Sequence, residues 1–379
     1  MTYARRRLWL GISGVGGTVV LATAGLLFDL PHRFISPIAD QTYGNALAAI
    51  ALTWMGHAVL LAPLDVIGGL VIVRERPGVL RWVASWLRAV TVQWLWFALA
   101  AALLLRTGQQ FGITAALIVF LLLQLTLLSR QGLIAWLAGG VHMEALSPAL
   151  GAAATAAGID PRTVREIDAD DPSFVGAWSG ADAQRLWVPQ RWVTGLSAGQ
   201  LTVALTRRLA VKSRGLRRRG VLVAITWNCI GFVAATAAPR ADLVTAPGFV
   251  TTLAWFTLWS FVGVLVLPSL SRPAVLVADR AAAHTHDVSL VASTITLLDQ
   301  WQDDEPVRGP RVETIFHPVP SRHARLAALL TVDSGDARDG AWHATRMMLY
   351  LSWAGLGGLA RAVHCNIGRP SVWVMLPGD

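Results

Sequence analysis

Six long apolar stretches divide this 379-residue sequence. Each contains about 16 or more mainly apolar residues, and roughly 20 such residues cross the hydrocarbon core of a bilayer as a helix. They run from Leu8 to Leu30, Leu47 to Val73, Val90 to Leu105, Ile113 to Leu128, Val221 to Ala238 and Val250 to Leu267. This pattern predicts a polytopic α-helical membrane protein with about six transmembrane helices.

Arginines mark one side of the predicted membrane. They cluster before the first stretch, between the second and third, and before the fifth, at Arg5, Arg6, Arg7, Arg74, Arg76, Arg81, Arg88, Arg214, Arg217, Arg218 and Arg219. Basic residues concentrate in cytoplasmic loops, so both termini and both polar blocks are expected in the cytoplasm. The segments Pro31–Gly44, Arg106–Gln110 and Pro239–Gly248 are then short loops on the opposite side.

The first polar block, about Gln131 to Arg219, carries signals for both helix and strand. The alanine-rich segment Ala145–Gly158 predicts a helix, and Ser197 with Gln200 forms a capping box that predicts another, extending toward Arg214. Short strands are predicted at Thr163–Ile167, Phe174–Trp178 and Arg185–Val188. This block is therefore expected to form an α+β domain.

The second polar block, about Ser269 to Asp379, is expected to be mainly helical. It opens with a helical run from Ala278 to Trp301, and a further helix is predicted near Arg322–Leu330. The segment Met347–Val363 is apolar but short and rich in glycine. It is predicted to be a buried or interfacial helix and not a seventh span.

Composition and charge exclude several classes of protein. Hydrophobic residues make up 54% of the chain and charged residues 15%, against about 45–50% and about 25% in soluble domains. The formal net charge is +9, but the arginines flank apolar stretches, so we expect contact with membrane lipid and none with nucleic acid. Two cysteines, Cys229 and Cys365, imply no disulfide framework. The sequence contains neither a phosphate-binding loop with its lysine nor a G-x-S-x-G elbow.

Three polar residues lie within predicted spans: His57 and Asp65 in the second, and Asn228 in the fifth. Such residues are costly in a membrane and often functional, so they are compatible with the ion or substrate path of a transporter-like module. Polar contacts inside the helical bundle are the interpretation that we favour over such a path. Asp65 is about nine residues from Arg74, roughly 13 Å along a helix, which is too far for a direct ion pair.

Short motifs follow one another in a characteristic order from about Ala145 to Leu330. Leu196-Ser197 opens a helix, two apolar stretches follow, and then come Ser271-Arg272, Ala278-Asp279 and His317-Pro318 before Arg325. This order resembles the HtpX-type membrane zinc metallopeptidases, related to the CAAX-processing proteases of the gluzincin clan. The resemblance implies a cytoplasmic α+β metallopeptidase-like domain split by a transmembrane hairpin, in the bacterial cytoplasmic (inner) membrane.

The resemblance also implies a division of the chain into five parts. Residues 1–130 form four transmembrane helices, and residues 131–219 form the first part of the peptidase-like domain. Residues 220–268 form the transmembrane hairpin, residues 269–335 the second part of the domain, and residues 336–379 a C-terminal helical tail.

The zinc-binding residues of the family are replaced in this sequence. The family motif H-E-x-x-H supplies two zinc-binding histidines on one helical face and a glutamate base. Its aligned positions hold Arg207, Arg208 and Val211, and Val275 replaces the glutamate that is the third ligand. Because arginine stays protonated and valine cannot coordinate, we expect no metal and no cofactor here. Asp279 resembles the aspartate near the family's zinc and is expected to pair with Arg207 or Arg208.

A different set of residues offers a weaker metal site. His284, His286 and Asp287 follow Ala278-Asp279, and His317 comes later. On a helix, positions two apart diverge by about 200°, so this H-x-H spacing suits a strand better than the helix predicted there. Zinc is expected only if these four residues act as non-standard ligands.

The replaced motif suggests a pseudopeptidase, which would act as a binding or regulatory subunit of an active membrane protease or complex. Its expected partner is an active metallopeptidase subunit, or a peptide or membrane-protein substrate. Two alternatives stay open at this point. The first is an active zinc metalloendopeptidase with non-standard ligands, and the second is a transporter-like membrane module.

Overall fold

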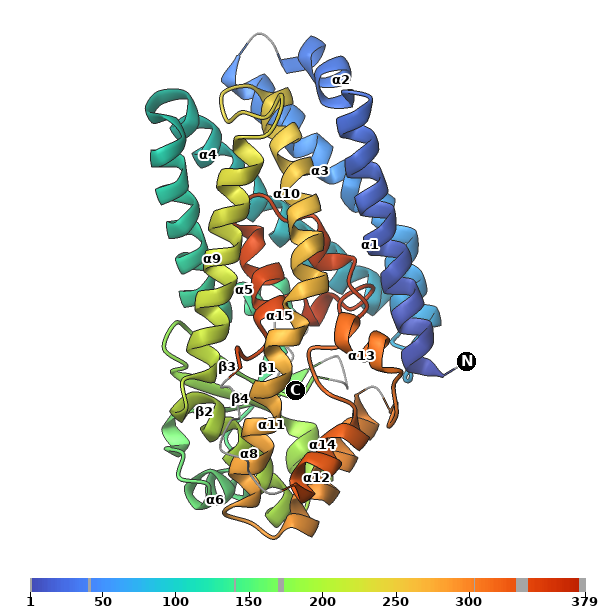
Figure 1. The fold of residues 1–379 in the computed structure, drawn as a ribbon, viewed down its shortest axis with the longest axis vertical. Helices are drawn as coiled ribbons and strands as arrows, with labels where there is room; N and C mark the ends of the chain where they lie inside the picture. Colours follow the sequence, from blue (N-terminus) through green and yellow to red (C-terminus); the bar gives the residue numbers. More distant parts are fainter. Residues whose placement is uncertain are drawn as a thin grey trace.

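The molecule is an elongated bundle of long helices with a small sheet at one end (Figure 1). The computed structural model describes residues 2–39, 42–139, 141–169, 174–302, 304–331 and 340–374. The bundle consists of α1 (Tyr3–Leu27), α2 (Leu30–Ala39), α3 (Tyr43–Val66), α4 (Val79–Ser129), α9 (Leu216–Thr236) and α10 (Ala246–Val266). In the described part of the chain, all of these except α2 are long and apolar enough to cross a membrane, which confirms the polytopic helical prediction.

Helix α4 accounts for two of the six predicted spans. Its 51 residues would extend about 76 Å if straight, more than twice the roughly 30 Å hydrocarbon core. Gly112 interrupts it with φ 74° and ψ −173°, a backbone conformation that is essentially restricted to glycine. The predicted loop at Arg106–Gln110 is therefore wrong, because that segment is helical and the break comes at Gly112. The loop predicted at Pro31–Gly44 is also wrong, since it contains most of α2.

A four-stranded sheet forms the centre of the first polar block. The strands are β1 (Val141–Met143), β2 (Val164–Ala169), β3 (Ala177–Ser179) and β4 (Arg185–Pro189), arranged β1-β2-β4-β3. The central pair β2 and β4 is parallel, and the two outer pairs are antiparallel. The predicted strands around residues 164 and 185 are confirmed. The strand predicted at Phe174–Trp178 corresponds to β3, which starts at Ala177. Strand β1 was not predicted, because its three residues are too few to show a periodic pattern.

Four helices accompany the sheet: α5 (Gln131–Ala138), α6 (Pro148–Ala156), α7 (Gln190–Gly195) and α8 (Ala198–Ser213). Residues of α6, the sheet, α7 and α8 share one buried apolar cluster that includes Leu150, Leu186, Trp192 and Leu205. The capping box at the start of α8 is confirmed. Ser197 Oγ accepts a hydrogen bond from the Gln200 backbone at 3.3 Å, and Gln200 Oε1 accepts one from the Ser197 backbone at 3.1 Å.

After the transmembrane hairpin formed by α9 and α10, four helices follow: α11 (Pro268–Ala283), α12 (Val288–Trp301), α13 (Pro310–Phe316) and α14 (Arg322–Leu330). The helix predicted near Arg322–Leu330 is confirmed. The single helix predicted from Ala278 to Trp301 is wrong, because α11 ends at Ala283 and a new helix begins after Asp287. The Asp287 carboxylate caps α12 by accepting from the backbone of Ser289 and Leu290.

Residues 340–374, the C-terminal segment, lie inside the helical bundle, where Figure 1 shows them in red beside α9 and α10. The segment begins with α15 (Ala344–Leu351) and continues in short 3₁₀ turns. Nearly all of its side chains are buried, which confirms the burial predicted for Met347–Val363, but the helix ends early. α15 ends at Leu351, and Gly355, with φ 129°, ends the 3₁₀ turn Ser352–Ala354 that follows it. The predicted tail from residue 336 lies partly outside the described residues.

Irregular backbone is tolerated at membrane depth only where protein surrounds it or it lines a water-filled cavity. In this bundle α4 and α9 supply that surrounding surface. Met348 and Leu351 share a buried apolar cluster with Leu104 of α4 and Phe232 of α9. The bundle therefore packs around the C-terminal segment, residues 340–374.

Candidate functional site

The positions that the sequence aligns with zinc ligands face one another across α8 and α11. Val211 of α8 and Val275 of α11 are each 1% exposed and belong to one apolar cluster with Ala278 and Trp342. Trp342 comes from the C-terminal segment, whose backbone is hydrogen-bonded to α11 and to the start of α9. Ala341 N donates to the carbonyl oxygen of Leu270 at 2.8 Å, and Trp342 N donates to that of Leu216 at 3.1 Å. This part of the α8–α11 face is therefore packed with apolar side chains.

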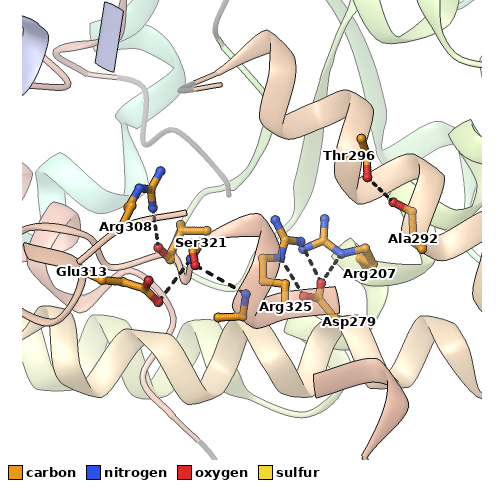
Figure 2. A network of polar contacts seen from close by, with 10 residues as sticks. Arg207, Asp279, Ala292, Thr296, Arg308, Glu313, Ser321 and Arg325 are labelled. Atoms are coloured by element: carbon orange, nitrogen blue, oxygen red, sulfur yellow. Dashed lines mark hydrogen bonds and ion pairs between the residues drawn. The ribbon is translucent and has the colours of Figure 1, made fainter. Parts of the chain in front are cut away.

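One turn away, Asp279 lies between two arginines (Figure 2). Arg207 Nε on α8 donates to Asp279 Oδ1 at 2.7 Å. Arg325 on α14 donates from Nε to Oδ2 at 2.8 Å and from Nη2 to Oδ1 at 2.9 Å. All three side chains are at most 3% exposed. Charge-assisted bonds of this kind, with a bidentate guanidinium, are the strong class of hydrogen bond, so the cluster ties α8, α11 and α14 together.

Arg208 takes a different role from its neighbour. Its Nη2 donates to the carbonyl oxygen of Val175 at 2.7 Å, and its guanidinium lies 5.5 Å from the ring of Trp192 and 5.9 Å from that of Trp342. These distances allow cation–π attraction. Of the two arginines considered as partners for Asp279, the structure therefore brings Arg207 to it and points Arg208 toward aromatic rings.

The residues at this face do not fit a zinc ion. Zinc in proteins takes imidazole, thiolate or carboxylate donors in a tetrahedral arrangement. Here two guanidinium cations already occupy both oxygens of Asp279, and two valines stand where further donors would be required. Over the described ranges of the chain, no group of three or more His, Cys, Asp and Glu residues is placed to hold a metal ion.

The four residues considered as alternative zinc ligands, His284, His286, Asp287 and His317, make separate contacts and do not come together as one group. His284 is exposed at the end of α11, and His286 Nε2 lies 3.0 Å from Thr206 Oγ1 on α8. Hydrogen bonds from the hydroxyl and backbone N–H of Ser289, and from the backbone of Leu290, lower the pKa of the Asp287 carboxyl below its ordinary value. His317 is buried elsewhere, with its ring 5.4 Å from that of His364.

The polar residues within the spans all contact the C-terminal segment. His57 Nε2 lies 3.2 Å from the carbonyl oxygen of Gly358. Asp65 forms an ion pair with Arg361 and accepts from the backbone of Gly368 at 2.8 Å and from Trp86 Nε1 at 2.9 Å. Asn228 Nδ2 lies 3.1 Å from the carbonyl oxygen of Met348 and 3.1 Å from Gln124 Oε1. These polar contacts hold the irregular C-terminal segment inside the bundle.

Two of these partners were not expected from the sequence. Arg325 was noted as part of a motif but not as a partner of Asp279. Arg361 lies in the apolar segment Met347–Val363, and no role is predicted for it from the sequence. A signal for Arg361 did exist, because a carboxylate within a predicted span requires a compensating charge, and Arg361 is an arginine in an otherwise apolar stretch.

Comparison with solved structures finds this fold in the crystal structure of S. mikatae Ste24p, with a TM-score of 0.66. The match covers 80% of this chain and 81% of that chain, at 13% sequence identity. At the level of the fold, the likeness agrees with the expected resemblance to CAAX-processing membrane metallopeptidases. No protein-family model matches the chain, and no curated protein matches it significantly. At this identity the likeness establishes the fold, and an activity must be argued from the residues.

Proposed function

We propose that this chain, which has a Ste24p-like membrane protease fold, is a pseudopeptidase that acts as a binding or regulatory subunit of an active membrane protease or complex. The observation that carries the proposal is the Arg207–Asp279–Arg325 cluster on the α8–α11 face. The guanidinium groups of Arg207 and Arg325 bind Asp279, the residue that resembles the aspartate near the family's zinc. Arg325 belongs to the motif order that resembles the family, so the feature particular to this chain is Arg207, a cation at a position where the family has a zinc-binding histidine.

The packing around this cluster supports a non-catalytic role. Val211 and Val275 are aliphatic, and Trp342 fills the space between their helices. A peptidase site needs an open position for water and substrate next to its metal. A buried apolar cluster offers neither, so the retained fold is better suited to binding than to hydrolysis.

We further propose that the partner is an active metallopeptidase subunit, or a peptide or membrane-protein substrate, and that the chain resides in a bacterial cytoplasmic membrane with its sheet domain in the cytoplasm. The supporting observation is the distribution of arginines. Arg5, Arg6 and Arg7 at the start of α1 and Arg217, Arg218 and Arg219 at the start of α9 mark one side of the bundle, which under the positive-inside rule is the cytoplasmic side.

The test is the metal content of the purified full chain, prepared without chelators and measured by inductively coupled plasma mass spectrometry. A restored variant, Arg207→His/Arg208→Glu/Val211→His/Val275→Glu, is measured beside it. A matched control, Arg207→Asn/Arg208→Gln/Val211→Asn/Val275→Gln, has side chains of similar size that ligate zinc weakly. We expect no stoichiometric zinc in the native chain or the control, and zinc bound by the restored variant.

One zinc per native chain would contradict the proposal and would direct attention to His284, His286, Asp287 and His317 as ligands of an active enzyme. Zinc in the control at the level of the restored variant would also contradict it. In that case the metal would be bound elsewhere, and the four aligned positions would not be the former site.

A further inference from the structure

Two cavities meet beside the start of α1, at the end of the bundle nearest the sheet. One is polar and the other apolar, and they share Pro318, Arg346, His364 and Cys365 as lining residues. The shared residues come from the connection after α13, from α15 and from the rest of the C-terminal segment. The two cavities therefore adjoin at these four residues, with the polar one on one side and the apolar one on the other.

The polar cavity is strongly basic. It has a volume of about 50 Å³. The charged residues that line it are five arginines and one carboxylate, namely Arg7, Arg308, Arg325, Arg346, Arg369 and Asp299. Arg7, Arg308 and Arg325 are at most 9% exposed, but Arg325 is paired with Asp279 and Arg308 with Glu305, so the attraction for an anion comes mainly from Arg7, Arg346 and Arg369. Charge-assisted hydrogen bonds from such arginines favour a compact anion.

The size of the polar cavity indicates which anion it can hold. A buried water needs roughly 10–15 Å³ of this volume, so the cavity accommodates about three to five waters. That is comparable to the oxygens of a single phosphate group. The planar guanidinium groups around it are also well suited to phosphate, which they can bind in a bidentate manner.

The apolar cavity is a groove of about 220 Å³ between α1 and α10. Its α1 side consists of residues 8, 11, 12, 15 and 16, which are spaced as one face of a helix. Phe261, Val264 and Leu265 of α10 line the opposite side. Gly16 leaves part of the groove open, because a Cβ added there would meet nothing within 4 Å. Both helices are long and apolar enough to cross a membrane, so the groove belongs to the membrane-spanning part of the bundle.

We propose that this site binds an anionic glycerophospholipid of the surrounding membrane, with its phosphate in the basic cavity and an acyl chain in the groove. A lipid of this class has an anionic headgroup next to apolar acyl chains, which matches a basic cavity next to an apolar groove. Basic pockets between transmembrane helices bind anionic headgroups, and the adjoining groove adds apolar contact to that attraction. The proposal does not depend on whether the chain hydrolyses peptides.

The test is a titration of the purified full chain in detergent, followed by native mass spectrometry. The probes are dioleoylphosphatidylglycerol, dioleoylphosphatidylcholine with the same acyl chains, and inorganic phosphate. We expect phosphatidylglycerol to bind at least about tenfold more tightly than phosphatidylcholine, because choline adds a cation beside the same phosphate and the arginines repel it. It should also bind more tightly than inorganic phosphate, which has no acyl chain for the groove.

Two pairs of variants locate the bound lipid. Arg346→Gln should weaken phosphatidylglycerol binding about tenfold, because Arg346 lines both cavities. Arg311→Gln should leave binding unchanged, since Arg311 is an exposed arginine of nearby α13. Gly16→Leu fills the groove and should weaken binding, whereas Gly17→Leu, whose side chain also enters open space, should have no effect.

Equal affinity for phosphatidylcholine would overturn the proposal, because the arginines would then not distinguish an anionic headgroup from a zwitterionic one. Competition by inorganic phosphate with no effect of Gly16→Leu would also overturn it, in favour of a site for a free anion. Equal effects of each variant and its control would show that lipid binds elsewhere. Each variant must first elute as a monodisperse peak in size-exclusion chromatography, as Gly17→Leu and Arg311→Gln are expected to do.

Discussion

At the scale of single residues, two buried aspartates depend on arginines that are distant in sequence. Asp279 is held by Arg207 and Arg325, and Asp65 by Arg361. All five side chains are at most 3% exposed. An ionised group in such surroundings is costly unless it is paired and hydrogen-bonded, so each cluster must form as a unit. Removing one member leaves an uncompensated charge in the interior.

Asp279→Ala should destabilise the protein by about 3–5 kcal/mol, because it leaves two buried guanidinium groups without their carboxylate. The measurement is thermal unfolding of the purified chain in detergent. Asp287→Ala serves as a control, since the exposed Asp287 only caps α12 and its loss should cost about 1 kcal/mol. A loss for Asp279→Ala no larger than that of the control would contradict the role given to the cluster.

At the scale of elements, one glycine separates two membrane spans. Gly112 turns α4 with φ 74° and ψ −173°, and a Cβ at this position would meet no other atom within 4 Å. The need for glycine is therefore a matter of backbone conformation and not of space. Side chains other than hydrogen make this region of φ and ψ unfavourable.

Gly112→Ala should destabilise the protein by about 1–3 kcal/mol through backbone strain alone. Gly17→Ala is the matched comparison, because Gly17 also has open space around its Cα but lies within the regular helix α1. Alanine there should be neutral or stabilising by up to about 1 kcal/mol. Denaturation of both variants in the same detergent measures the difference, and equal stability of the two would show that α4 does not require glycine at its break.

At the scale of the whole molecule, the C-terminal segment joins the membrane bundle to the α8–α11 face. Its residues contact α3 through Asp65, α9 through Asn228, and the candidate site through Trp342. Polar groups on the spans thus act as anchors for a segment that cannot satisfy its backbone by regular helix alone. The fold of the bundle and the packing of the candidate site depend on the same stretch of chain.

A double-mutant cycle on Asp65 and Arg361 tests this connection. Arg361→Ala should cost about 3–5 kcal/mol, since it leaves Asp65 buried without a cation. The double variant Asp65→Ala/Arg361→Ala should be less destabilised than the sum of the single variants by about 1–3 kcal/mol. Unfolding monitored in detergent gives all four stabilities. Additive losses would mean that the ion pair does not help to hold the C-terminal segment in the bundle.

The amino-acid sequence by itself determined the membrane-spanning helices, the capped helix α8, the helix α14 and two of the strands. These elements follow from signals between neighbouring residues: long apolar runs, a Ser197–Gln200 capping box, and alternation over a few positions. The same kind of signal misplaced the turn in α4, because Gly112 acts through a backbone angle that a hydropathy pattern does not contain.

Only the tertiary structure decided which distant residues meet. The sequence predicted that Asp279 pairs with Arg207 or Arg208, and it left open whether Asp65 lies on a transport path or makes a polar contact inside the bundle. Arg325 and Arg361 reach these carboxylates because α14 packs against α11 and the C-terminal segment enters the bundle. Such pairings depend on the packing of whole elements, with 46 residues separating one pair and 296 the other, and no local pattern records them.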